Sequence, residues 1–272
     1  MKNRLLESVC EAVEPLVFYA SLWECVAANP AIRLAAISFV LRHIDRKNSI
    51  MDQVHLLGGD AIVIVKAICA SLLDQSVLVQ RCALDLLSLA LPMHVEVIKF
   101  SHQDLVEVVA AATSVLLRRD MSLNRRLYNW LCGTYESSSS STKAGNKGQA
   151  RPSHKRTDSE VSLDDSSIYF SHYSKGLLIE AVKLIFQRSL DNSSDDQPDL
   201  KSYRLVMTLL DKPDVGGAIL EDIMIDVLRA MYHSTNKGGG THNAQGKSNL
   251  QHQNNLGTFF KKKYLQKLRN SN

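Results

Sequence analysis

The chain has 272 residues, of which 45% are hydrophobic and 22% are charged, so it is long enough for one large hydrophobic core or two smaller ones. Aromatic residues make up only 6%, which favours packed helices over a β-sandwich. The formal net charge is +4, but residues 233–272 carry seven positive charges and no negative ones, which leaves −3 for residues 1–232. This balance argues against nucleic-acid binding by the folded part of the chain.

The cysteines and the apolar runs indicate a cytosolic protein. Five cysteines lie singly among apolar neighbours, without a CxxC pair: Cys10, Cys25, Cys69, Cys82 and Cys132. Reduced thiols are their simplest interpretation. Glu7, Glu11 and Glu14 fall where a secretory signal needs an unbroken apolar run. Because Lys66 interrupts a strongly apolar run, no membrane span is expected.

Residues 4–132 predict a succession of helices with short breaks between them. The candidate helices cover residues 16–28, 31–44, 50–56, 60–73, 76–91 and 101–118. Breaks of this length suit antiparallel helical neighbours. Helix 76–91 is apolar around most of its circumference, which predicts that other helices cover it on most sides.

Several local signals predict where these helices begin and end. Asp74 or Ser76 is a candidate N-cap, and Ser101 with Asp104 predicts a capping box. Gly58-Gly59 lacks the spacing of a phosphate-binding loop and is interpreted as a turn between two helices.

A faint repeat of about 45 residues runs through this part of the chain. Arg33, Arg81 and Arg125 are 48 and 44 residues apart. Each follows an Asn or Asp residue and precedes an apolar helix, as in the inner helices of HEAT or armadillo repeats. The pattern predicts an all-α fold, a HEAT/armadillo-like α-solenoid of about ten helices, with an irregular helical domain as the alternative.

Composition divides the chain into four segments. Helical repeats are predicted at residues 4–132 and 171–232. Residues 133–170 are rich in serine and poor in large apolar side chains, which predicts a disordered linker. Residues 233–272 form a basic, low-complexity tail that is expected to be disordered.

No arrangement of residues typical of an enzyme or a metal site is found. The nine histidines lack HExxH or HxH spacing, and no nucleophile, base and orienting group fall into a known pattern. We therefore predict no catalytic, cofactor-binding or metal site. An enzyme with an unrecognised site is a rival hypothesis, which a deep pocket lined by convergent polar groups would support.

Two arginine pairs form the unusual local feature of the sequence. Arg118-Arg119 and Arg125-Arg126 lie on either side of Asp120. In the structural interpretation, Asp120 caps the following helix, the first pair lies at the end of the preceding helix, and the second pair contacts neighbouring repeats. In the functional interpretation, the four arginines dock an acidic partner or a phosphoinositide headgroup. Tyr128 and Trp130, which follow, are expected in the core.

Four stretches are specific enough to indicate a family: residues 29–37, 74–81, 116–131, and 209–214 with 220–222. Together they resemble the N-terminal region of the Dopey family, and the run RRDMSLNRR at residues 118–126 is the most distinctive. The resemblance covers residues 16–132 closely and 168–232 more thinly. Dopey proteins are very large cytosolic scaffolds, so the resemblance implies that this chain is a piece of one or a truncated product.

The resemblance also implies a function. It predicts a non-enzymatic scaffold in vesicle-mediated protein transport between endosomes and the trans-Golgi, cytosolic and peripheral on Golgi and endosome membranes, with a Mon2-type partner and no cofactor. Kinesin light chain and phosphatidylinositol 4-phosphate are alternative binding partners. A nucleic-acid-binding helical repeat that uses the basic tail is a more distant alternative. The resemblance assigns no partner contact to an individual residue.

Overall fold

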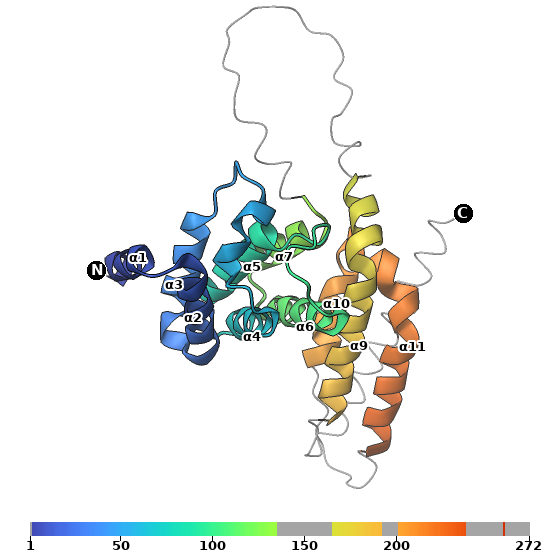
Figure 1. Cartoon of the computed structure of the whole chain (residues 1–272). Helices are drawn as coiled ribbons and strands as arrows, with labels where there is room; N and C mark the ends of the chain where they lie inside the picture. Colours follow the sequence, from blue (N-terminus) through green and yellow to red (C-terminus); the bar gives the residue numbers. More distant parts are fainter. Residues whose placement is uncertain (1, 135–164, 192–200, 238–257, 259–272) are drawn as a thin grey trace, which may run out of the picture. The chain divides into compact units, whose positions relative to one another are not determined.

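The structure is a computed structural model that describes residues 2–134, 165–191, 201–237 and 258 (Figure 1). The α-helices are α1 (Lys2–Ala12), α2 (Pro15–Ala28), α3 (Pro30–His43), α4 (Ala61–Leu72), α5 (Val77–Ala90), α6 (His102–Thr113), α7 (Met121–Leu131), α9 (Lys175–Asp191), α10 (Lys201–Leu210) and α11 (Pro213–Lys237). Two 3-10 helices, η1 (Ile50–Leu57) and η2 (Ser114–Arg118), and a π-helical turn, η4 (Phe170–Ser174), connect them. No strand occurs in the described residues, and the predicted all-α, solenoid-like class is confirmed.

The chain divides into two compact units. Unit 1 comprises residues up to Val115 together with Arg119–Ser174, and unit 2 comprises Leu116–Arg118 together with the chain from Lys175 onward. The predicted first block ended at residue 132, whereas unit 1 also includes the helical residues 165–169 and η4.

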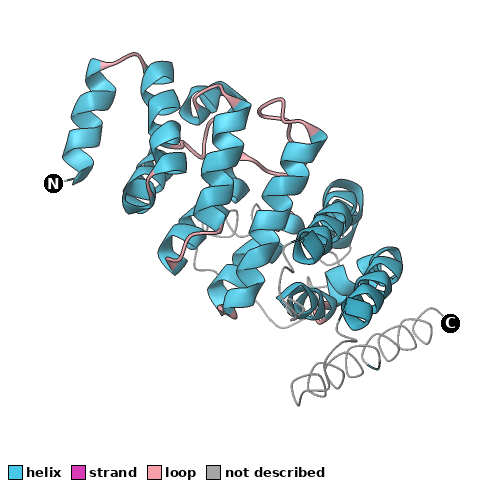
Figure 2. Ribbon diagram, turned by 90° about the horizontal axis from the view of Figure 1, so that it is seen from below, coloured by secondary structure: helices cyan, strands magenta, loops and turns pink. Residues whose placement is uncertain are grey.

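Unit 1 has two layers of helices. Helix α2 packs against α4 and α4 against α6, while α3 packs against α5 and α5 against α7. Helices α2 to α5 thus each contact the α-helix two positions further along the chain, which is the arrangement that stacked helical repeats produce. Figure 2 shows successive helices of this unit lying side by side as an array.

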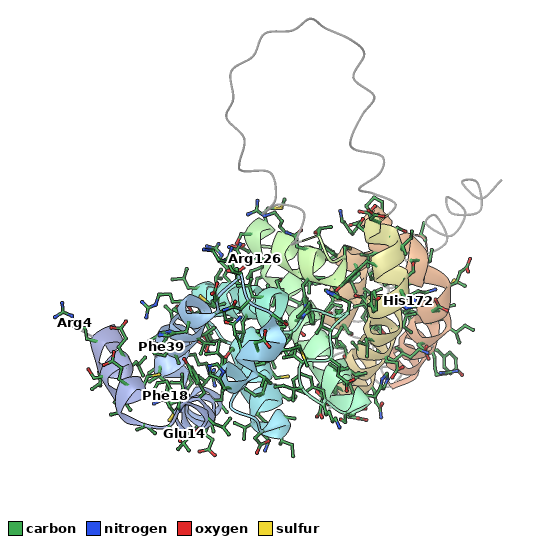
Figure 3. The ribbon with its side chains drawn as sticks, turned by 45° about the horizontal axis from the view of Figure 1, so that its top comes forward. Arg4, Glu14, Phe18, Phe39, Arg126 and His172 are labelled. Atoms are coloured by element: carbon green, nitrogen blue, oxygen red, sulfur yellow. The ribbon has the colours of Figure 1, made fainter. Side chains whose placement is uncertain are left out.

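The core of unit 1 lies between these layers. Trp23, Phe39, Leu84 and Leu87 are fully buried. Figure 3 labels Phe18 of α2 and Phe39 of α3, whose ring centroids are 5.7 Å apart. Every one of these side chains removes apolar surface from water, and this burial is the main favourable contribution to folding.

Both tryptophans have their polar atom satisfied within the core. The indole Nε1–H of Trp23 donates to the carbonyl oxygen of Leu56 at 2.9 Å, and that of Trp130 donates to Leu91 at 2.9 Å. A buried indole N–H without such an acceptor would destabilise the fold. The expectation that Trp130 is a core residue is confirmed, while Tyr128 is half-buried.

The local signals for helix ends are largely confirmed. Ser101 and Asp104 form the predicted capping box at the start of α6. Gly58 ends η1 in the left-handed region, at φ 71°, and a Cβ atom there would lie 2.8 Å from the backbone of Ala20. This position therefore requires glycine, and the predicted turn between helices is confirmed.

One helix boundary differs from the sequence prediction, and one predicted cap residue makes no capping hydrogen bond. The helix predicted to reach Arg118 ends at Thr113, after which the chain continues as the 3-10 helix η2. The hydroxyls of Thr113 and Ser114 donate to the carbonyls four residues earlier, at 2.6 and 2.9 Å, a pattern that often bends helices. At the start of α5, Ser76 occupies the N-cap position, but its side chain makes no capping hydrogen bond.

Parts of the predicted linker and of the predicted tail are helical. Residues 165–169 are helical and lead into η4, so helix begins inside the predicted linker, 133–170. Helix α11 continues to Lys237, five residues into the predicted tail, 233–272. The expected disorder of both segments concerns residues that lie outside the described ranges.

Unit 2 is built on three helices. Helix α11 packs against α9 and α10, and α9 also contacts α10. Its core is apolar and includes Leu178, Phe186, Tyr203, Leu209 and Ile223. The rings of Phe186 and Tyr203 meet edge to face with centroids 5.3 Å apart. Burial of these side chains holds the unit together in the same way as in unit 1.

None of the described helices is by itself long and apolar enough to cross a membrane. Taken together, η1 and α4 reach that length and composition, but they are bent by 81°.

Candidate functional site

A series of Arg–Asp ion pairs crosses the layer formed by α3, α5 and α7. The first pair joins Arg33 of α3 to Asp74, which lies just before α5, with 2.8 Å between Nη1 and Oδ2. Arg33 also donates to the carbonyls of Val26 and Ala27. Both side chains of the pair are nearly buried, at 11% and 9% exposed. Such a pair is well satisfied, and removing one partner would leave a buried charge.

The second pair repeats the first one helix further along. Arg81 of α5 donates through Nη2 to Asp120 at 3.0 Å, directly before α7. Asp120 is also the N-cap of α7, because its other oxygen accepts from the backbone N–H groups of Ser122 and Leu123 at 2.9 and 3.0 Å. The predicted capping role of Asp120 is therefore confirmed, and one carboxylate both starts a helix and joins it to its neighbour.

The hydrogen bonds around Asp120 favour its charged form. The backbone N–H of Leu123 has the largest effect and lowers the pKa of the Asp120 carboxyl, and the hydrogen bonds from Arg81 and Ser122 lower it further. Hydrogen bonds to a carboxylate stabilise the anion over the acid. Asp120 is therefore ionised at neutral pH and fully available to Arg81.

Arg126 makes a third pair across the same two helices. Its Nε donates to Asp85 of α5 at 2.8 Å, and its Nη1 donates to the carbonyl of Ser122 at 3.3 Å. Figure 3 labels Arg126. The structural interpretation of Arg126, a contact to the neighbouring repeat, agrees with this geometry. Asp85 was not identified from the sequence as this partner, because the two residues are 41 positions apart in the chain.

Two of the four arginines are exposed and make no polar contact with the described residues through their side chains. Arg119 and Arg125 have no ion pair or side-chain hydrogen bond with any described residue. Met121, at 82% exposed, lies four residues before Arg125 on α7, so the two side chains share a face of the helix. We refer to Arg119, Met121 and Arg125 as the α7 edge. It combines two positive charges with one apolar side chain, a combination suited to an acidic partner.

Arg119 also has an unusual backbone. Its φ of 55° lies in the left-handed region, which residues other than glycine seldom adopt. Holding a non-glycine residue there costs on the order of 1 kcal/mol. The short connection between η2 and α7 therefore turns at Arg119, whose charged side chain is exposed.

Arg118 belongs to the other unit. It is the last residue of η2, it is exposed, and it groups with unit 2 together with Leu116 and Leu117. The predicted set of four arginines is therefore distributed over two units, and the α7 edge is defined from unit 1 alone.

Within the described ranges, no group of three or more His, Cys, Asp or Glu side chains is arranged to hold a metal ion. The histidines of unit 1 instead contact neighbouring backbone and aromatic groups. For example, the Nδ1 atom of His43 lies 2.9 Å from the carbonyl oxygen of Phe39.

Comparison with known proteins found one matching family model and several similar proteins. The family model described as "Dopey, N-terminal" matches residues 2–136. The chain is 37% identical over 241 residues to a Protein DOP1 homolog of Drosophila melanogaster, an alignment that covers 86% of this chain and 8% of that protein. It is 40% identical over 228 residues to Protein DOP1B of Mus musculus, covering 79% of this chain and 9% of that protein.

A more distant relative is Protein DOP1 of Saccharomyces cerevisiae, 25% identical over 169 residues, which cover 61% of this chain and 9% of that protein. The chain thus spans less than a tenth of the length of these three relatives. No solved structure matches it. The aligned region includes the whole two-layer stack of unit 1, with its Arg–Asp pairs and the α7 edge. On this evidence the chain belongs to the Dopey family.

Proposed function

We propose that this chain is a non-enzymatic, protein-binding scaffold and that the α7 edge is one of its docking sites. The observation that carries the proposal is the unequal use of the arginines in unit 1. Arg33, Arg81 and Arg126 are paired with aspartates inside the helix layer, whereas Arg119 and Arg125 are exposed without such partners among the described residues. Charges that the fold does not use are available for a partner.

Membership of the Dopey family supports a finer proposal. The scaffold acts in protein transport between endosomes and the trans-Golgi, in the cytosol and peripherally on those membranes, and it binds a Mon2-type protein. Kinesin light chain is an alternative protein partner. Since the chain spans less than a tenth of the relatives compared, these activities are proposed for it as part of a longer protein.

A pull-down from a Golgi-containing lysate tests the docking site. The parent chain is compared with Arg119→Glu/Arg125→Glu and with a control, Lys66→Glu/Lys99→Glu, which makes the same charge change at two exposed residues of unit 1. Circular dichroism first establishes that all three fold. Mass spectrometry should identify a Mon2-type protein with the parent and the control, and a strong loss with the arginine variant.

The other outcomes separate the two parts of the proposal. Equal capture by all three chains would retain the scaffold and reject the α7 edge as its docking site. Capture by none of them would contradict binding of this partner by the chain.

A phosphoinositide is the second candidate ligand, because exposed guanidinium groups pair well with phosphates. Sedimentation with vesicles that contain or lack phosphatidylinositol 4-phosphate tests it. Binding that requires this lipid and disappears in Arg119→Glu/Arg125→Glu, but not in Lys66→Glu/Lys99→Glu, would assign the edge to a membrane surface. Binding that is equal with both vesicles would reject the lipid.

A further inference from the structure

A half-open pocket of about 240 Å³ lies in unit 1 near the end of α7, and no role considered so far uses it. Its walls are mainly aromatic and are formed by Pro92, His94, Asn129, Trp130, Tyr169 and Tyr173. This volume is smaller than the pockets that enclose drug-sized ligands, which begin at about 300 Å³. The pocket therefore suits a single side chain of a partner better than a complete small molecule.

The tyrosine at the centre of the wall is held in place from two sides. The Tyr169 hydroxyl is hydrogen bonded to Nδ1 of His94, with 3.0 Å between the two atoms. On the other side the ring lies against Gly133, where a Cβ atom would come within 2.7 Å of two ring carbons. Gly133 also has a φ of 65°, so glycine is required there twice over. These contacts fix the ring before any ligand arrives.

Three rings of the wall are inclined to one another. The centroids of His94 and Tyr169 are 5.5 Å apart at an interplanar angle of 73°, and those of Tyr169 and Tyr173 are 5.0 Å apart at 52°. His94 and Tyr173 complete the triangle at 6.1 Å and 61°. The faces of the two tyrosine rings carry a negative quadrupole and attract cations within about 6 Å of the centroid, while His94 orients Tyr169. A group seated against this triangle can approach several rings at once.

The polar atoms of the wall add hydrogen-bond acceptors. Asn129 contributes an amide, Ser88 also lines the pocket, and Tyr173 contributes a hydroxyl at a side chain that is 40% exposed. Among the described residues, no Asp, Glu, Lys or Arg lines the pocket. The described wall therefore combines aromatic rings with neutral oxygen atoms and contains no carboxylate.

We propose that this pocket binds an arginine side chain of a partner protein. A guanidinium is planar, stacks on aromatic faces, is more weakly hydrated than an ammonium and has five N–H donors for neutral acceptors. These properties match the inclined rings and the surrounding oxygens more closely than a lysine does. The proposal does not depend on the α7 edge, because the two sites share no residue.

The two tryptophans make a direct test possible. Trp130 lines the pocket, whereas Trp23 is fully buried against Leu56, so the two indole N–H signals of an NMR spectrum report on different places. The full chain is titrated with N-acetyl-arginine methylamide and with its citrulline analogue, which keeps the planar shape but is uncharged. The arginine compound should shift the Trp130 signal and leave Trp23 unchanged. Citrulline should bind about 2- to 30-fold more weakly, as loss of a cation–π contact implies.

Substitution of the exposed wall residue separates a cationic site from an apolar one. Tyr173→Phe keeps the aromatic face and should bind the arginine compound within a few-fold of the parent chain. Tyr173→Leu keeps an apolar side chain but removes the ring, and it should bind several-fold more weakly. Because Tyr173 is partly exposed, both variants are expected to fold, which circular dichroism checks.

Three results would overturn the proposal. Equal binding of arginine and citrulline would show that charge is not recognised. The absence of any Trp130 shift at tens of millimolar arginine compound would show that the pocket is not a site. Tighter binding of choline than of the arginine compound would assign the pocket to a quaternary ammonium group, such as a lipid headgroup.

Discussion

The two units bury similar apolar cores but treat charged residues differently. In unit 1, Arg33 and Asp74 form a nearly buried pair that joins successive helices of one layer. In unit 2, the pairs Lys175–Asp222 and Lys183–Asp226 join α9 to α11 at partly exposed positions. Exposed pairs contribute about 0–1 kcal/mol, whereas breaking a buried one is strongly destabilising.

This difference shows what a repeated stack needs beyond an apolar core. Apolar contacts are not directional, so they favour stacking without fixing how far one helix slides along the next. An arginine that reaches the residue before the next helix fixes that offset through a geometrically specific bond. Unit 1 has such a bond at both Asp74 and Asp120. We refer to the pairs Arg33–Asp74 and Arg81–Asp120 as the polar seam, which is part of the architecture of unit 1.

The largest expected effect tests the apolar core, which both units have. Leu84 of α5 is fully buried, and Leu84→Ala should lower the free energy of unfolding by about 2–5 kcal/mol. Leu87→Ala should do the same, since Leu87 is equally buried. Urea denaturation followed by tryptophan fluorescence measures the effect, because both tryptophans lie in unit 1.

Two controls accompany this measurement. Leu78 lies on the same helix and is 54% exposed, so Leu78→Ala should change stability little. Leu209→Ala, at a fully buried residue of unit 2, should destabilise that unit by a similar amount, as followed by circular dichroism. Equal midpoints for Leu84→Ala and Leu78→Ala would contradict the core described for α5.

The second prediction tests the burial of the ion pairs, in which the units differ. Asp74→Ala removes one partner of the nearly buried pair and should destabilise unit 1 by about 3 kcal/mol. Asp222→Ala removes one partner of an exposed pair in unit 2 and should lower stability by about 1 kcal/mol or less. Denaturant titrations of both variants give the comparison. If the two losses were equal, burial of the Arg33–Asp74 pair would add nothing to its contribution to unit 1.

The third prediction concerns how closely two helices approach in unit 2. A Cβ atom at Gly216 would lie 2.6 Å from the backbone of Leu210, so Gly216→Ala must separate α10 from α11 and should cost about 1–3 kcal/mol. Gly217, its neighbour in α11, faces open space. Gly217→Ala should therefore stabilise the helix by about 0.5–1 kcal/mol. Thermal melts should move in opposite directions, and a shift of the same sign in both would contradict the close approach.

The smallest expected effect is the pH dependence of the seam. Folded Asp120 has a lowered pKa, so its carboxylate stabilises the fold above the unfolded pKa of about 3.9. That contribution is lost as the pH falls through the lower folded value. Asn caps helices almost as well as Asp but does not titrate. Between pH 6 and pH 3, the urea midpoint of the parent chain should therefore fall more than that of Asp120→Asn, and parallel curves would exclude this carboxylate as a source of acid sensitivity.

Local features of the fold were predictable because their causes lie within a few residues of one another. Ser101 and Asp104 are three residues apart and form the predicted capping box. Asp120 and the N–H groups that it accepts are separated by two and three residues. The apolar periodicity likewise predicted an all-α fold, and the spacing of Arg33 and Arg81 indicated the repeat.

The partners of the candidate site could not be predicted in the same way. Arg126 pairs with Asp85, 41 residues earlier, and the Tyr169 hydroxyl meets His94 across 75 residues. No pattern in the sequence distinguishes Arg125, which is exposed, from its neighbour Arg126, which is paired. Which of the two arginines faces α5 depends on how α7 is rotated about its own axis, and that rotation is set by the packing of the two helices.

The sequence by itself determined the helical class, the positions of most caps and turns, and the family, because these depend on short-range hydrogen bonds, on periodic apolar residues and on distinctive local motifs. The tertiary structure decided which arginines join the seam, which remain exposed on the α7 edge, and that Gly133, His94 and Tyr169 come together in an aromatic pocket. These outcomes depend on how separate helices stack, and stacking brings together residues that the chain keeps far apart.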